Sequence, residues 1–130
     1  MIICGGMAFT FKKTLENVAV SILFRYRSII NQLSSLSQIG NSLFDKPGSE
    51  KVAHLVEKAK TNNVKLVLPV DYITADKFAK DAEVGYATDE QGIPDGWMGL
   101  DVGPLSREKF RSTVLEAKTI LWNGQVIHQL

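Results

Sequence analysis

Cysteine is almost absent from this sequence, since Cys4 is the only one, so no disulfide can form within the chain. That absence excludes the small secreted domains that depend on disulfides, and it favours a reducing compartment. Histidine is also scarce: His54 and His128 are the only two, and neither lies in a recognisable metal-ligand motif. We therefore expect no metal ligand in this chain.

An excess of charge of either sign is missing too. The 15 lysines and arginines nearly balance 14 aspartates and glutamates, which argues against nucleic acid as the main partner. No apolar run approaches the roughly 20 residues that span a bilayer, and the N-terminal residues lack the basic segment and long apolar core of a signal peptide. We expect a cytoplasmic protein with no membrane partner.

What the sequence does contain is an apolar run, residues 2–4, that leads into the pair Gly5-Gly6 and then a helical pattern. This is the layout of a strand whose carboxyl end holds a ligand under a helix N-terminus, where glycine allows a nucleotide close to the backbone. Neither standard phosphate-loop pattern is present. A tight turn without a ligand therefore remains the other interpretation.

Helical and strand-like patterns alternate along the rest of the chain. Apolar stripes predict helices, two of them with a capping serine at the first residue, and short apolar runs predict buried strands. Such alternation is typical of a parallel, doubly wound sheet, so we expect a three-layer α/β/α, Rossmann-like fold. The expected helices are residues 7–17, 49–62 and 106–118, and the expected parallel strands are residues 2–4, 64–68 and 119–122.

Residues 18–38 differ sharply in composition from both neighbours. They contain no acidic residue, and Arg25 and Arg27 are their only charges. Residues 20–26 alternate like a strand, and the remainder has a loosely helical pattern. We interpret residues 19–38 as an insertion, which could dock a partner, although no amphipathic stripe supports contact with a membrane surface.

Five blocks of the sequence stand out when they are read together. They are IICGGMAFTFKKTL at residues 2–15, IGNSLFD at 39–45, LPVDYITAD at 68–76, GIPDGWMGLDVGP at 92–104 and AKTILWNG at 117–124. In these blocks the sequence resembles the phosphoglycerate kinase family, and their order and spacing fit the family everywhere except at residues 19–38.

The resemblance implies that residues 1–130 are part of the C-terminal, nucleotide-binding domain, an incomplete α/β domain with an insertion at 19–38 and a non-family tail at 125–130. The family transfers phosphate between ATP and 3-phosphoglycerate in glycolysis, forming ADP and 1,3-bisphosphoglycerate, and uses Mg²⁺ with the nucleotide. A separate N-terminal domain of the family holds 3-phosphoglycerate, and the family enzyme is usually monomeric.

The same resemblance implies a set of nucleotide-binding residues and no catalytic residue or Mg²⁺ ligand in these 130 residues. Since the family's phosphate lysine and metal-proximal aspartate have no counterpart here, we expect the chain alone to be inactive. The implied contacts are Gly5 and Gly6 at the adenine and ribose, Leu43 and Phe44 beside the adenine, Gly99, Leu100 and Asp101 over the base, and Asn123 near the phosphates.

Cys4 departs from the family, which usually has a third glycine at this position. A position that needed positive φ would strain a cysteine. As a side chain, Cys4 is either a small buried residue, the interpretation we favour, or a reactive thiol at a helix N-terminus. A non-catalytic nucleotide-binding protein and a protein-interaction module remain alternatives to an enzyme fragment.

Two further groups of residues have competing interpretations. Asp71, Asp76 and Asp101 could perform acid/base chemistry, but we expect solvated turn residues at strand ends. Trp97 and Trp122 could stack on a base, and packing in the core or a loop is at least as good an expectation.

Overall fold

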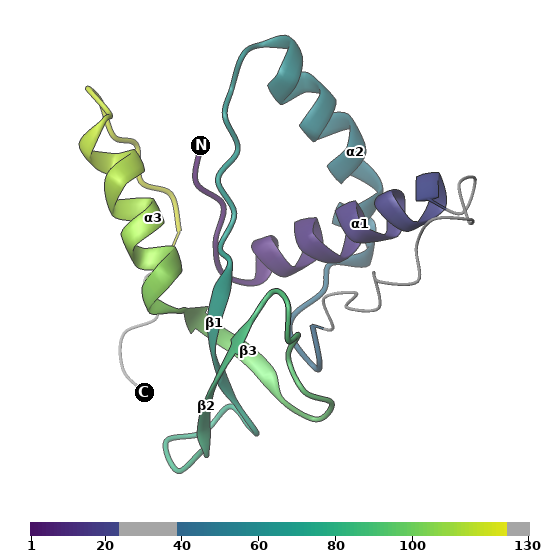
Figure 1. Ribbon diagram of the computed structural model, residues 1–130, viewed down its shortest axis with the longest axis vertical. Helices are drawn as coiled ribbons and strands as arrows, with labels where there is room; N and C mark the ends of the chain where they lie inside the picture. Colours follow the sequence, from purple (N-terminus) through teal and green to yellow (C-terminus); the bar gives the residue numbers. More distant parts are fainter. Residues whose placement is uncertain (24–38, 125–130) are drawn as a thin grey trace.

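The computed structural model describes residues 1–23 and 39–124 of the chain. Helices and strands are mixed along it, and Figure 1 shows α1 crossing the centre, with α2 on one side and the sheet on the other. None of the helices in these residues is long and apolar enough to cross a membrane. The elements are α1 (Gly6–Leu23), α2 (Lys46–Thr61), β1 (Asp71–Ala75), β2 (Val84–Thr88), β3 (Met98–Val102) and α3 (Pro104–Leu115).

The sheet has three strands in the order β2-β1-β3, and both pairings are antiparallel. Ile73 of β1 lies opposite Tyr86 on one side and Asp101 on the other. The short link between β1 and β2 allows only antiparallel pairing, because a parallel crossover needs a dozen or more residues. The α/β class is confirmed, and the three strands of the sheet lie within residues 71–102.

The expected parallel sheet is not found in the described residues. Residues 2–4 and 64–68 share one parallel bridge, Ile2 to Val67, in which Ile3 N–H donates to Val67 O at 3.0 Å. Pairing ends there because the chain turns at Gly5 and because Pro69 has no N–H to donate. The prediction of a third strand at residues 119–122 is wrong, because these residues form no strand.

Two of the expected helices are present with shifted ends. α2 begins at Lys46, so Ser49 lies in its first turn instead of capping it, and its hydroxyl donates to Lys46 O. The helix ends at Thr61 with Asn62 as its C-cap, and Asn63 has a φ of 53°. α3 begins at Pro104, because proline at the first helical position removes no hydrogen bond, and it ends before the expected residue 118.

α1 extends beyond the expected end at residue 17 and includes residues 19–23 of the predicted insertion. These residues are helical here, so the strand-like alternation does not hold for them. Alternation is a weak signal in a run of apolar residues that can continue an existing helix. The rest of the predicted insertion, residues 24–38, and the predicted tail, 125–130, lie outside the described residues.

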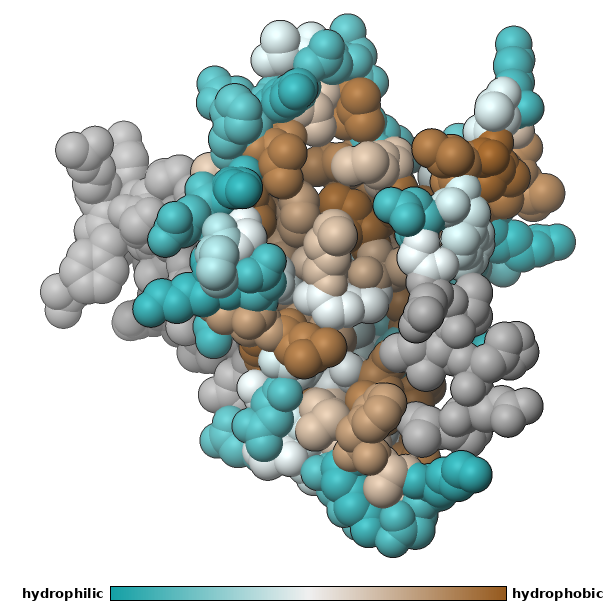
Figure 2. Space-filling model, turned by 180° about the vertical axis from the view of Figure 1, so that it is seen from behind, coloured by the Kyte–Doolittle hydropathy of each residue, from teal (hydrophilic) through white to brown (hydrophobic). Residues whose placement is uncertain are grey.

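α1 buries two faces and so joins the two parts of the core. Its Phe9 ring packs on Tyr72 of β1, with centroids 5.0 Å apart, in a cluster with Ile39 and Ile93. The other face packs Ala8 and Phe11 in a second cluster with Ile3 and Val52. Apolar residues also gather in the middle of the face in Figure 2, with hydrophilic residues around them.

Candidate functional site

A groove of about 490 Å³ lies between the N-terminal parts of α1 and α2. Its size is within the range of small-molecule sites, and most of its lining is apolar. We call it the α1–α2 groove. It is lined by Gly6, Met7, Thr10, Phe11, Leu43, Phe44, Asp45, Gly48, Lys51, Val52 and Leu55.

The glycine pair forms the turn at the start of α1. Gly5 has a φ of 64°, a conformation that favours glycine, and its carbonyl accepts Ala8 N–H at 3.0 Å. A Cβ on Gly6 would lie 3.2 Å from Leu43 Cβ, so a glycine there lets Leu43 approach the helix start. The predicted glycine turn before the helix is present, although residues 2–4 before it form a single bridge and no full strand.

Cys4 is not strained, because it is not among the described residues with positive φ. Its side chain is exposed, however, so the expectation that it is buried is wrong. Successive side chains of an extended segment point to opposite sides. Because Ile3 is buried in the core, its neighbour Cys4 points outward.

Leu43 and Phe44 form an apolar wall of the α1–α2 groove, beside Gly6. Leu43 is 78% exposed and Phe44 is 37% exposed, although both are large apolar residues. The Lys13 ammonium lies 4.9 Å from the centroid of the Phe44 ring. This cation–π contact joins α1 to the loop that carries Phe44. The wall therefore offers apolar surface that a flat ligand could cover.

The loop that carries this wall is tied to the sheet. Asn41 N–H donates to Trp97 O at 2.7 Å, and Gly40 bridges to Met98 at the start of β3. Gly40 has a φ of 52°, and a Cβ there would lie 2.3 Å from Trp97 O, so this crossing needs glycine. Trp97 itself packs against the core, as the packing interpretation expected.

The other residues implied by the resemblance lie away from the groove lining. Gly99 sits in β3, where a Cβ would meet the Phe9 ring at 2.3 Å, and Leu100 beside it is half-buried. Asp101 is exposed and its carboxylate accepts Val102 N–H at 2.7 Å, while Asn123 is exposed beyond α3. The structure thus brings Gly6, Leu43 and Phe44 together, next to Gly5. The roles of all these residues stay predictions.

Asp71 forms a polar centre that sequence reasoning missed. It is fully buried at the start of β1, which corrects the expectation of a solvated turn residue. Its carboxylate accepts Ser106 N–H at 2.7 Å, Leu105 N–H at 2.9 Å, Tyr86 O–H at 3.0 Å and the Ser106 hydroxyl. Asp71 therefore caps α3 from another element, a contact that no local spacing could have shown.

Two opposing effects set the pKa of Asp71. Burial raises it, but hydrogen bonds from Ser106, Leu105 and Tyr86 outweigh burial and leave the pKa of Asp71 lowered. Burial and the bond to Asp71 both raise the pKa of Tyr86. These shifts mark a structural contact away from the α1–α2 groove. The solvated-turn interpretation fits Asp76, which is exposed and accepts Glu83 N–H at 2.8 Å.

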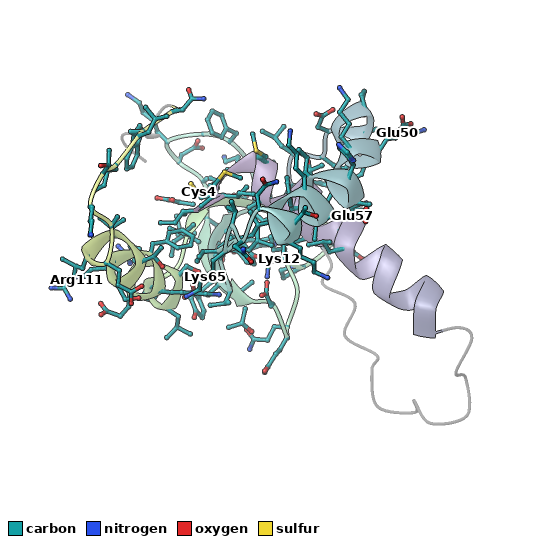
Figure 3. All side chains as sticks on the ribbon, turned by 90° about the horizontal axis from the view of Figure 1, so that it is seen from above. Cys4, Lys12, Glu50, Glu57, Lys65 and Arg111 are labelled. Atoms are coloured by element: carbon teal, nitrogen blue, oxygen red, sulfur yellow. The ribbon has the colours of Figure 1, made fainter. Side chains whose placement is uncertain are left out.

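A second polar contact links α1 to the sheet. The Lys12 ammonium pairs with Asp89, whose other carboxylate oxygen accepts the Tyr72 hydroxyl proton at 2.8 Å. Figure 3 shows Lys12 in the crowded centre of the molecule, with Glu50 and Arg111 on opposite sides of it. Across the part of the chain that the structure describes, no group of three or more His, Cys, Asp and Glu could hold a metal.

One tryptophan and two histidines remain to be placed. Trp122 is exposed and its indole N–H donates to Gly124 O at 3.2 Å, so it neither packs in the core nor lines the groove. His54 is exposed on α2, and His128 lies outside the described residues.

Comparisons with known proteins show the family of this chain. The family model for phosphoglycerate kinase matches residues 1–126. The phosphoglycerate kinases of Yarrowia lipolytica and Funneliformis mosseae are 63% and 60% identical over 124 residues. Each match covers 95% of this chain and 25% of the relative, so the chain spans about a quarter of the relatives' length.

A solved structure gives the same result for the fold. The phosphoglycerate kinase of Coxiella burnetii matches with a TM-score of 0.69 and 29% identity, over 95% of this chain and 27% of that one. The family match extends over nearly all of the sequence, including the glycine turn and the loop that form the α1–α2 groove. The chain therefore belongs to the phosphoglycerate kinase family.

Proposed function

We propose that this chain forms the adenine side of the nucleotide site in a phosphoglycerate kinase. The whole protein would transfer a phosphoryl group between ATP and the carboxylate of 3-phosphoglycerate, in cytoplasmic glycolysis. The α1–α2 groove carries this proposal, because it unites Gly6, Leu43 and Phe44, three residues for which the family resemblance implies contact with adenine or ribose.

The chemistry of the groove suits a purine better than a charged group. Gly6 has no side chain to hold a flat base away, and Leu43 and Phe44 supply apolar surface for it to cover. Lys51 and Asp45 provide the charges in the lining. A nucleoside could thus bind by its base while its phosphates extend out of the groove.

The remaining implied contacts extend the proposed site. Gly5 would lie beside the ribose, Gly99, Leu100 and Asp101 would lie over the base, and the Asn123 amide would donate to a phosphate oxygen. The described residues do not fit a Mg²⁺ site, because they contain no cluster of metal-ligating side chains. We therefore assign no step to Mg²⁺, and we propose that its ligand and the 3-phosphoglycerate site belong to other parts of a monomeric enzyme.

Binding measurements on the purified chain test the proposal. In ligand-observed NMR, adenosine and ATP should bind with similar, weak affinity and compete, because the groove would hold the base. Tripolyphosphate should not compete. The substitution Leu43→Asp should abolish binding, because it places a charge in the apolar wall. Leu115→Asp is the matched control, since Leu115 is equally apolar and 70% exposed but lies on α3.

Two results would contradict the proposal. Competition by tripolyphosphate with no competition by adenosine would mean that phosphate binds elsewhere. Equal loss of binding in both leucine variants would remove the α1–α2 groove from the site. A coupled assay with ATP, Mg²⁺ and 3-phosphoglycerate should show no turnover above background for these 130 residues alone, because phosphate neutralisation supplies most of the catalysis in phosphoryl transfer.

A further inference from the structure

Two buried hydroxyl groups flank the apolar wall of the α1–α2 groove. Thr10 is 4% exposed and Ser42 is 8% exposed. The Leu43 and Phe44 side chains, which lie between Ser42 and the residue that Thr10 contacts, are open to solvent. Buried hydroxyls need hydrogen-bond partners, because an unpaired one costs free energy. The partners of these two hydroxyls show what they hold.

Thr10 holds the end of the wall that follows Phe44. It lies on α1 one turn after Gly6, and its Oγ1 accepts Asp45 N–H at 3.0 Å. The same hydroxyl donates to Gly6 O at 3.5 Å. The backbone just after Phe44 is therefore tied to the helix turn that begins with Gly6.

Ser42 holds the other end, just before Leu43. Its Oγ accepts Gly99 N–H at 2.8 Å, which ties the loop to β3. The loop is thus bonded to α1 at residue 45 and to the sheet at residue 42, and the two residues between these anchors are those of the wall. Neither hydroxyl has to touch a ligand for this arrangement to matter.

We propose that Thr10 and Ser42 are positioning residues, which fix Leu43 and Phe44 as the wall of the α1–α2 groove. This proposal rests on the proposed function in so far as the ligand is the base of an adenine nucleotide. On an untied loop these two exposed apolar side chains could leave this position. The two hydroxyls hold the loop so that Leu43 stays against Gly6, where a Cβ would lie 3.2 Å from Leu43 Cβ, and so keep the wall in one position for a flat ligand.

The test uses variants at Thr10. Thr10→Val keeps the shape but removes the acceptor for Asp45 N–H, and Thr10→Ser retains that acceptor. Thr14→Val is the matched control, because Thr14 lies one turn further along α1 and its hydroxyl donates to Thr10 O at 2.7 Å, away from the loop. Ser42→Ala releases the other end and serves if Thr10→Val fails to fold.

Two readouts keep the outcomes separate. Without ligand, the Asp45 amide should exchange hydrogen about tenfold faster in Thr10→Val, which also should lose the Overhauser contact between Leu43 and Gly6; Thr10→Ser and Thr14→Val should retain both. With ligand, the adenosine dissociation constant should rise about tenfold in Thr10→Val and recover in Thr10→Ser.

Unchanged amide exchange and an unchanged Leu43–Gly6 contact in both Thr10→Val and Ser42→Ala would overturn the positioning role. So would equal effects of Thr10→Val and Thr14→Val, which would indicate helix destabilisation alone. If adenosine does not bind the native chain while the ligand-free contacts respond as expected, the nucleotide proposal fails and the positioning of the wall stands.

Discussion

Replacing Asp71 by alanine should destabilise the fold more than any other single polar substitution in the sheet. The carboxylate is fully buried and accepts hydrogen bonds from three residues on two other elements, β2 and α3. Loss of an N-terminal cap costs about 0.5–2 kcal/mol, and a buried donor left unpaired costs about 1–3 kcal/mol. Because Ser106 is buried as well, its N–H has no access to water. We therefore expect a loss of about 3 kcal/mol in the free energy of unfolding.

Urea titration followed by far-ultraviolet circular dichroism measures this loss. Asp71→Asn should cost about half as much, because asparagine keeps the size and one acceptor oxygen but places an amide donor near the helix N–H groups. Tyr86→Phe is the control, and it should cost less than about 1 kcal/mol because Tyr86 is half-exposed and water can replace its partner.

The dependence on pH gives an independent check. The pKa of Asp71 is lowered from its ordinary value of 3.8, so the unfolded chain binds more protons than the folded chain in the range just below that value. The stabilisation that the ionised Asp71 carboxylate gives the fold is therefore present at neutral pH. It is lost as the pH falls through the pKa of Asp71 in the folded chain. The difference between the native chain and Asp71→Asn should shrink on acidification below 3.8. A loss below about 1 kcal/mol in Asp71→Ala, or a difference from Asp71→Asn that does not change with pH, would refute this reasoning.

Three other changes have defined outcomes. Gly99→Ala should lower the free energy of unfolding by about 1–3 kcal/mol, because the added Cβ would meet the Phe9 ring. A thermal melt measures this as a lower melting temperature, and an unchanged one would contradict that packing. Lys12→Met should cost about 1.5 kcal/mol in urea titration, since Asp89 loses this cation, and a stability equal to the native value would contradict it. Deleting residues 19–38, which include the last five residues of α1, should improve soluble yield and thermal stability, because residues 18–24 carry no charge and no proline, a composition that favours aggregation. Lower yield after the deletion would show that the segment is an integral part of the fold.

The sequence alone was enough to predict the family, the glycine turn and the core of two helices. These features depend on neighbours along the chain. Gly5 has a positive φ in a turn that its neighbours along the chain form. Val52 and Ala59 lie on one buried stripe of α2 because helical spacing places them on the same face. The predicted starts of the two helices were less accurate. α2 begins after Asp45 and α3 begins at Pro104, and both starts precede the serines that were expected to cap them.

Only the tertiary structure decided how distant segments meet. The antiparallel sheet, the exposed residues 119–122 and the burial of Asp71 against α3 all depend on partners far along the chain, which local patterns do not encode. The same holds for the α1–α2 groove, where Thr10 and Asp45 are separated by 35 residues and joined by one hydrogen bond. Residue types determined which side chains could bind a base, and long-range hydrogen bonds and packing decided which of them share one surface.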